Sequence, residues 1–194
     1  GLAVIGPEDT TVLPGDLSWA LGIEQAKEDF AFISAIPGRK ILLKGNHDYW
    51  WTTATKFYHF CAARGWDDMF ILNNNCYFYG ETALCGTRGW FYEQEQEGTH
   101  DEKIFRRELG RLEASLKAAG DHEKLCFLHY PPRYRGYECP EILGLLARYG
   151  VRQCFYGHLH AESMRLAIQG SFGGCEFRLL SADYVNFKPQ KLLD

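Results

Sequence analysis

The sequence predicts an α/β layered fold with a mixed β-sheet. Short runs rich in β-branched and aromatic residues alternate with helical patterns in the first part of the chain, and adjacent strand pairs follow later. The chain has 194 residues, of which 46% are hydrophobic and 24% are charged, an ordinary balance for one folded unit with its own core. Because no repeat, low-complexity tract or linker divides it, we expect a single domain over residues 1–194.

Eight segments have the composition and length of β-strands. They cover residues 10–15, 39–45, 68–73, 76–80, 82–87, 124–130, 152–157 and 175–182.

Apolar residues three and four positions apart predict four helices, over residues 19–36, 52 or 53 to 64, 101–119 and 140–149. Thr52 or Thr53 is a suitable N-cap for the second helix, and Pro140 suits the first turn of the last one. Gly65, Gly120 and Gly150 follow the last three helices and are typical stops.

The charge and the cysteines exclude several classes of protein. A net charge of −4 argues against non-specific binding of nucleic acid, which needs a basic surface. None of the seven cysteines forms a Cys-x-x-Cys pair, which excludes zinc-ribbon and thioredoxin-like sites. Several cysteines lie inside apolar runs, where a thiol behaves as a small hydrophobic group, and this pattern indicates a reducing compartment. Neither a signal peptide nor a membrane-spanning apolar run is found. We therefore expect a cytoplasmic protein with no membrane partner.

Four polar clusters directly follow predicted strands: Asp16, the run Asn46-His47-Asp48, His129, and the pair His158 and His160. Each has an ordinary alternative interpretation, as a turn aspartate, an Asx-type turn, a strand-end histidine or a chance His-x-His. However, loops at the carboxyl ends of strands in an open α/β sheet converge on one crevice. This shared position favours one common site over four unrelated turns.

The side chains of these clusters suit a divalent metal site that acts on phosphate. Carboxylate, amide and imidazole groups are ligands for Mn, Fe, Zn and similar ions, and a carboxylate can bridge two of them. Asn46 adds a ligand without adding negative charge, so it does not repel an anionic phosphate. Asp48 is next to His47 and is placed to orient it as a proton donor to the leaving group.

Taken in order, Gly15-Asp16, Gly45-Asn46-His47-Asp48, His129 and Gly157-His158-Leu159-His160 resemble the motifs of calcineurin-like metallophosphoesterases. The resemblance spans nearly the whole chain. It is closest to a bacterial branch of predicted phosphohydrolases, through segments such as "PGDLSWA", "KGNHDYWW", "LHYPP" and "SADYVNFKP". It implies a four-layer α-β-β-α sandwich, in which two mixed β-sheets are flanked by helices.

The resemblance also implies a role for each residue. Asp16 would bridge two divalent metal ions (Mn, Fe, Zn or Ni). Asn46, His129 and His158 would hold one ion, and His160 would hold the other. His47, paired with Asp48, would be the proton donor or would stabilise the transition state.

One family motif is absent from the sequence. The family begins with an Asp-x-His strand that supplies two ligands to the ion held by His160, and residues 1–15 contain no histidine. Because every later motif is intact, we expect a missing N-terminal strand rather than a degenerate protein. We also expect the second metal site to be weak or empty in this chain.

Arginines close to the motifs are candidates for binding substrate phosphate, since a guanidinium matches phosphate oxygens bidentately. Arg88 lies in a glycine-flanked loop after a strand, which favours this role. Arg133 and Arg135 follow His129 closely, and for these two a solvated surface position is an equal alternative.

The sequence therefore predicts a metal-dependent phosphohydrolase that cleaves a phosphomonoester or phosphodiester with a metal-bound hydroxide at a dinuclear site. Its expected partner is a small phosphorylated substrate. The missing first motif favours one alternative, a non-catalytic domain that binds metal or phosphate. A second alternative is a nuclease, against which the net charge argues.

Overall fold

The protein is described here by a computed structural model that covers residues 4–90 and 99–193. Its strands are β1 (Thr10–Leu13), β2 (Arg39–Leu42), β3 (Met69–Ile71), β4 (Cys76–Tyr79), β5 (Thr82–Thr87), β6 (Glu123–Leu128), β7 (Arg133–Tyr134), β8 (Tyr137–Glu138), β9 (Gln153–Tyr156), β10 (Gly170–Phe172) and β11 (Cys175–Leu179). Its helices are α1 (Lys27–Ser34), α2 (Ala54–Ala62), α3 (Thr99–Ala118), α4 (Pro140–Arg148) and the 3₁₀ helix η2 (Ala161–Leu166).

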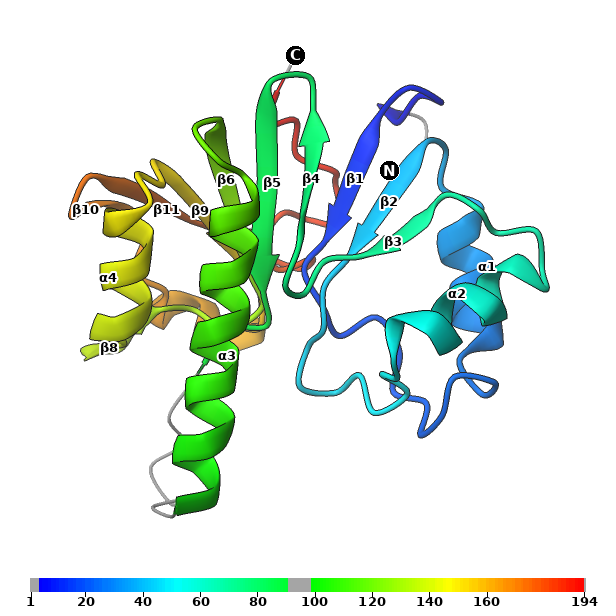
Figure 1. Cartoon of the computed structure of the whole chain (residues 1–194), viewed down its shortest axis with the longest axis horizontal. Helices are drawn as coiled ribbons and strands as arrows, with labels where there is room; N and C mark the ends of the chain where they lie inside the picture. The colour runs from blue at the N-terminus through cyan, green and yellow to red at the C-terminus, as the bar shows by residue number, and fades with distance from the viewer. Residues whose placement is uncertain (1–3, 91–98, 194) are drawn as a thin grey trace.

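The strands form two main sheets (Figure 1). The small sheet has the order β1-β2-β3 and is parallel. The large sheet has the order β10-β11-β9-β6-β5-β4 and is mixed, because its central strands are parallel while β10 and β4 run antiparallel to their neighbours. Strands β7 and β8 make a separate small hairpin.

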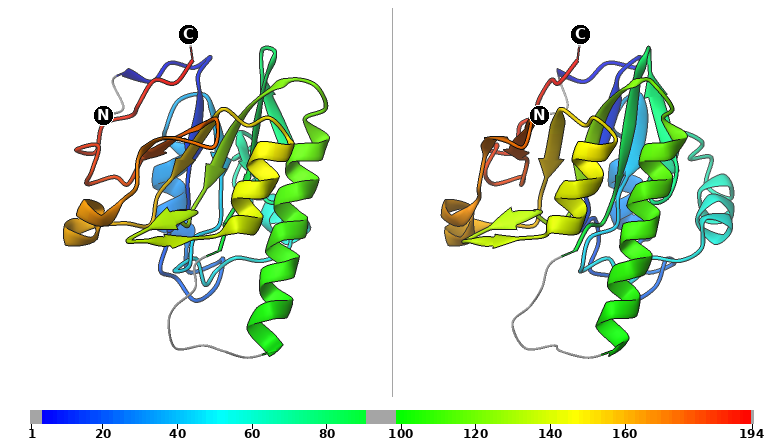
Figure 2. Two further views of the ribbon diagram at one scale, coloured as in Figure 1. Left: turned by 90° about the vertical axis from the view of Figure 1, so that its left-hand side faces the viewer. Right: turned by 60° about the vertical axis from the view of Figure 1, so that its left-hand side comes forward.

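The sheets and helices form four layers, with α1 and α2 outside the small sheet and α3 and α4 outside the large one (Figures 1 and 2). Alternation along the strands explains this arrangement. In β5, Ala83 and Cys85 join the cluster under α3 and α4, while Leu84 between them faces the other sheet. In β2, Leu42 packs toward α1 and α2, and Ile41 points the opposite way.

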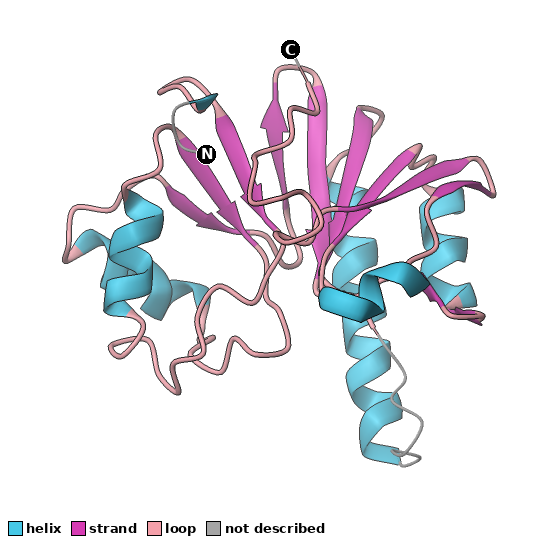
Figure 3. Ribbon diagram, turned by 180° about the vertical axis from the view of Figure 1, so that it is seen from behind, coloured by secondary structure: helices cyan, strands magenta, loops and turns pink. Residues whose placement is uncertain are grey.

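A hydrophobic cluster between the two sheets holds them together. Ile41 of β2 and Leu43, which directly follows β2, pack against Phe127 and Phe155 of the large sheet. All four side chains are buried. The C-terminal segment, residues 180–193, passes over this cluster and packs leucine side chains against it (Figure 3). The predicted four-layer α-β-β-α fold is confirmed.

All eight predicted strands are present, but the first helix is shorter than its periodicity suggests. The apolar pattern predicts a helix over residues 19–36, whereas α1 begins at Lys27. Residues 18–20 are irregular and residues 21–26 form bends and turns. Ser18 is held outside any helix, because its N–H donates to Asp48 and its hydroxyl to Asp29. The strands of two or three residues, β7, β8 and β10, are too short to give a periodic signal.

Cysteines form a row across the large sheet. Cys76, Cys85, Cys126 and Cys154 are in register on β4, β5, β6 and β9. All are free thiols, and burial raises the pKa of Cys85, so it behaves as a small apolar group under the helices. Within residues 4–90 and 99–193, no helix has the length and apolar character needed to cross a bilayer.

Candidate metal centre

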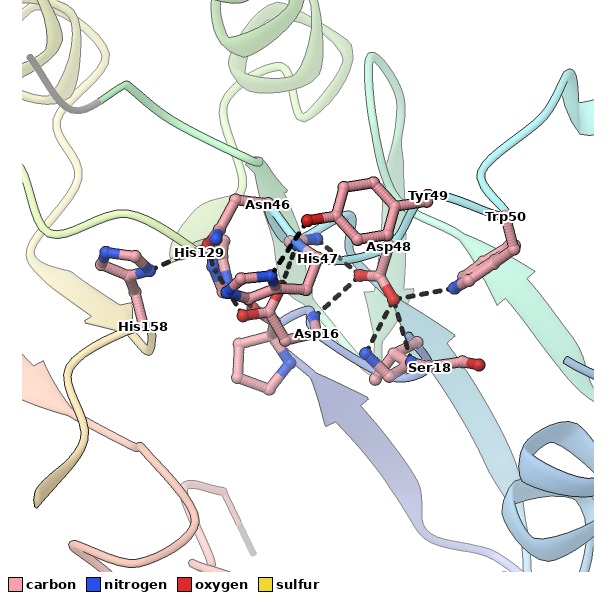
Figure 4. A network of polar contacts seen from close by, with 12 residues as sticks. Asp16, Ser18, Asn46, His47, Asp48, Tyr49, Trp50, His129 and His158 are labelled. Carbon is pink, nitrogen blue, oxygen red and sulfur yellow. Dashed lines mark hydrogen bonds and ion pairs between the residues drawn. The ribbon is translucent and has the colours of Figure 1, made fainter. Parts of the chain in front are cut away.

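Four strands from the two sheets deliver the predicted ligands to one edge of the sandwich. Asp16 follows β1, Asn46 follows β2, His129 follows β6 and His158 follows β9. Figure 4 shows these side chains close together, with Asn46 between the two imidazoles. Ligand atoms of Asp16, His129 and His158 lie within 4.8 Å of one another.

Two glycines allow the loops after β1 and β2 to approach this closely. A Cβ atom on Gly15, whose φ is +98°, would lie 2.6 Å from the Gly45 nitrogen and 2.7 Å from Nδ1 of His129. A Cβ on Gly45 would lie 2.0 Å from Oδ1 of Asp16. All three distances are shorter than a Cβ atom tolerates, so each position requires glycine.

Asp48 shapes the loop that carries Asp16. Its side chain is 1% exposed and accepts five hydrogen bonds of 2.7–3.1 Å, four from main-chain N–H groups and one from the Trp50 indole. The main-chain donors are Asp16, Leu17, Ser18 and Gly45. Successive N–H groups that surround one carboxylate hold the loop in a single conformation.

His129 is fixed as a neutral imidazole whose lone pair points into the site. Its Nδ1 lies 2.9 Å from the carbonyl oxygen of Pro14, which can only accept, so Nδ1 carries the proton. Nε2 then presents its lone pair 2.7 Å from Oδ1 of Asn46 and 3.5 Å from Oδ2 of Asp16. A backbone carbonyl that orients a histidine in this way is typical of metal ligands.

The electrostatics of the site favour a cation. Burial lowers the pKa of His129, and burial together with the nearby His129 lowers the pKa of His158 to about 4, so both rings are neutral at pH 7. Oδ1 of Asn46 is also 3.0 Å from Nδ1 of His158. Carboxylate, amide and imidazole groups that converge in this way suit a divalent metal ion.

Two of the ligand residues have a strained backbone. Asp16 has φ 57° and His158 has φ 69°, in the left-handed region that residues other than glycine rarely adopt. Such strain concentrates at functional sites, where the surrounding structure imposes it. For Asp16, the imposing contact is its own N–H bond to Asp48.

His47 lies at the rim of the site, with different partners from the one expected. Its main-chain N–H donates to Oδ1 of Asp16 (2.8 Å), and its Nδ1 lies 3.3 Å from the hydroxyl of Tyr49. The Trp19 indole stacks on its ring at 4.2 Å with an interplanar angle of 7°. The expected pairing with Asp48 is replaced by the contact with Tyr49, because both oxygens of Asp48 are occupied by the loop N–H groups.

His160 lies outside the group formed by Asp16, His129 and His158. Its side chain is half exposed, and its Nδ1 is 2.8 Å from Oδ1 of Asp183. Oδ2 of Asp183 accepts the N–H of Ala161 at 2.8 Å. Although partial burial opposes the shift, the hydrogen bonds from Ala161 and His160 lower the pKa of Asp183. The sequence analysis quoted the segment "SADYVNFKP", which contains Asp183, but gave Asp183 no role, because 23 positions separate it from His160.

Arg88 lies beside the metal centre and is joined to it by the backbone. Its carbonyl oxygen accepts the N–H groups of His129 and Tyr130, at 3.1 and 2.9 Å. Its guanidinium lies 3.9 Å from the buried carboxylate of Glu108 on α3. Among the residues that the structure describes, its buried Nε has no hydrogen-bond partner. Lys44 is a second basic residue at this position, and burial and the charge of Arg88 lower its pKa. It is the first residue of the segment "KGNHDYWW", but the sequence analysis gave it no role.

The structure brings Arg133 into the β7–β8 hairpin rather than into the ligand group. Its guanidinium bonds to Glu138 (2.8 and 2.9 Å) and lies 3.7 Å above the ring centroid of Phe172. Arg135 has φ 47° and donates its main-chain N–H to Leu166. The Arg133 side chain is only 17% exposed, so it is not the solvated surface group of the stated alternative, whereas Arg135 is exposed.

Comparison with protein families gives a match over residues 2–162 to the family described as calcineurin-like phosphoesterase. The chain belongs to the calcineurin-like phosphoesterase family. The match includes all four ligand-bearing strand ends and His160. No curated protein matches the chain. Within the matched residues, the fold gathers Asp16, Asn46, His129 and His158 at one edge.

Proposed function

We propose that this protein hydrolyses phosphoesters with the aid of a divalent metal ion held by Asp16, Asn46, His129 and His158. The observation that carries the proposal is the convergence of acceptor atoms from four strand ends, with His129 fixed in the tautomer that a metal ligand needs. Membership of the calcineurin-like phosphoesterase family supports the same chemistry. An ion bound there would act as a Lewis acid toward phosphate oxygens and would acidify a water molecule.

The remaining site residues have separate tasks in this proposal. In its protonated form, His47 donates from Nδ1 to the hydroxyl oxygen of Tyr49, and it can give the proton on Nε2 to the leaving-group oxygen, which leaves a neutral imidazole. Arg88 binds the phosphate, since its Nε lacks a partner among the described residues while Glu108 holds the guanidinium in place. The substrate is a small phosphorylated molecule.

We further propose a second, weaker ion site at which Asp16 and His160 are ligands. Asp183 would orient His160 as a carboxylate orients a metal-bound histidine, by accepting a hydrogen bond from the Nδ1–H group. We expect this second ion to bind weakly, because the described residues offer it only two ligands, Asp16 and His160.

The direct test of the proposed function is metal-dependent turnover. Protein stripped with a chelator is assayed with p-nitrophenyl phosphate and bis(p-nitrophenyl) phosphate, before and after addition of Mn²⁺. We expect hydrolysis of at least one ester only after the metal is added. Absence of turnover with Mn²⁺, Fe²⁺, Zn²⁺ and Ni²⁺ would favour a domain that binds metal or phosphate without catalysis.

Replacing His47 should separate proton donation from metal binding. We expect His47→Ala to lose about 10²- to 10⁴-fold in kcat, the usual contribution of a general acid, while bound metal is unchanged. Steady-state kinetics and metal analysis of the same preparation measure the two quantities. His59→Ala is the matched control, because His59 is an exposed histidine on α2. Loss of metal from His47→Ala would make His47 a ligand instead.

Replacing Asp183 should affect only the second ion. We expect Asp183→Asn to weaken that ion's binding by about 10-fold, the lower end for loss of a group that orients a metal-bound histidine. Titration calorimetry with Mn²⁺ resolves the two sites. Glu162→Gln, which changes an exposed neighbour in η2, is the control. Equal weakening of both sites would contradict the separate role assigned to Asp183.

A further inference from the structure

Two exposed aromatic rings flank His47 at the rim of the metal centre. Trp19 is 69% exposed although its indole stacks on the imidazole, and Tyr49 is 55% exposed and meets the same imidazole edge-on at 81°. Trp50, the next residue, is only 2% exposed. Trp50 is therefore buried, whereas Trp19 and Tyr49 are open to solvent beside His47, the proposed proton donor.

The backbone holds Trp19 outward. Ser18 is buried, with its N–H bonded to Asp48 and its hydroxyl to Asp29, and the N–H of Ala20 donates back to the Ser18 oxygen. The residues on both sides of Trp19 are thus fixed while its ring projects into solvent. A ring that is already ordered loses little conformational entropy when a ligand stacks on it.

The part of a substrate that Trp19 and Tyr49 would contact depends on where these two rings lie relative to the metal ligands. Asn46, the residue before His47, faces both imidazole ligands, and the His47 N–H is bonded to Asp16. If His47 protonates the leaving group, the ester oxygen of a phosphoryl group bound at the ligand cluster lies on the His47 side. The alcohol portion of such a substrate would then lie against Trp19 and Tyr49, the two rings that contact His47.

We propose that Trp19 and Tyr49 bind the leaving group and select phosphoesters whose alcohol carries a planar ring, either an aryl alcohol or a nucleoside. This inference rests on the proposed function, because His47 marks the leaving-group side only if the site cleaves phosphoesters. Planar rings stack on an indole face, whereas puckered aliphatic rings of similar size gain only the contact area. Selection therefore depends on ring planarity rather than on hydrophobicity alone.

The first test measures binding of two phosphonates that cannot be hydrolysed. Benzylphosphonate and cyclohexylmethylphosphonate have the same anionic group and rings of similar size, and calorimetry on the full chain with Mn²⁺ gives both Kd values. We expect the Mn²⁺-loaded protein to bind the benzyl compound about 3- to 10-fold more tightly, the range for one aromatic pair. In Trp19→Ala this ratio should fall close to one, and Trp19→Phe should restore most of it.

Leu21→Ala is the matched control, since Leu21 lies in the same segment and is 77% exposed. It should keep the ratio of the unaltered protein. A ratio near one in the unaltered protein, or the same decrease in Trp19→Ala and Leu21→Ala, would overturn the inference.

The second test uses turnover and separates the two sources of the ring. Relative kcat/KM is measured for benzyl against cyclohexylmethyl phosphate and for adenosine 5′-monophosphate against ribose 5-phosphate. The pair that loses its preference in Trp19→Ala identifies the source as an aryl alcohol or a nucleoside. If no ester is hydrolysed while the phosphonate ratio still depends on Trp19, the proposed function fails and the ring-binding surface stands.

Discussion

Asp48→Ala is expected to destabilise the protein by about 3–5 kcal/mol, the usual cost of removing one partner from a buried charged network. The substitution leaves four main-chain N–H groups and the Trp50 indole without their acceptor. Each buried donor without a partner costs about 1–3 kcal/mol, and water entering the cavity recovers part of the total. The loop that carries Asp16 should lose its fixed conformation, so metal affinity should fall as well.

Urea unfolding measures this change, and Asp67→Ala provides the comparison. Asp67 is an exposed aspartate before β3, and its removal should change the free energy of unfolding by no more than about 0.5 kcal/mol. If Asp48→Ala unfolds at the same urea concentration as Asp67→Ala, then Asp48 does not organise the loop.

Asp16→Asn is expected to weaken Mn²⁺ binding by about 100-fold or more while leaving the fold intact. Loss of an orienting residue alone costs 10- to 100-fold in metal affinity, and here a charged ligand itself is removed. Asparagine is nearly the same shape and can keep its oxygen toward the N–H of His47, so the loop should hold its position. Activity at limiting Mn²⁺ should fall in parallel.

Metal titration, with unfolding measured on the same samples, checks this result. Asp9→Asn is the control, because Asp9 is an N-terminal aspartate that bonds to Gly6 rather than to the site. Unchanged affinity in Asp16→Asn would remove Asp16 from the ligand set. A loss of affinity that accompanies a loss of stability would show a structural effect instead.

The gathering of ligands could be predicted because each of them directly follows a strand. Asp16, Asn46, His129 and His158 are local in sequence to β1, β2, β6 and β9, and parallel strands place such residues at one edge. The residues alone predict an α/β fold with a mixed sheet, and the four layers are what the resemblance to calcineurin-like metallophosphoesterases implies. The gathering of ligands depends on a short-range pattern, which a single sequence displays.

The partners of the polar side chains could not be predicted, because they depend on loop conformation. Adjacency in sequence pairs Asp48 with His47, whereas the folded loop presents the N–H groups of residues 16–18 to Asp48. The same contacts replace the first part of the predicted helix at 19–36 with turns, and they leave Trp19 on the surface. The contact of His160 with Asp183 also joins two loops that no periodic pattern relates.

Anomalous X-ray diffraction from crystals of the protein grown with Mn²⁺ tests the central claim most directly. The account predicts a manganese peak coordinated by Oδ2 of Asp16, Oδ1 of Asn46, Nε2 of His129 and a ring nitrogen of His158, with a weaker peak beside His160. A manganese peak that is absent from this cluster, or that lies elsewhere on the protein, would contradict it.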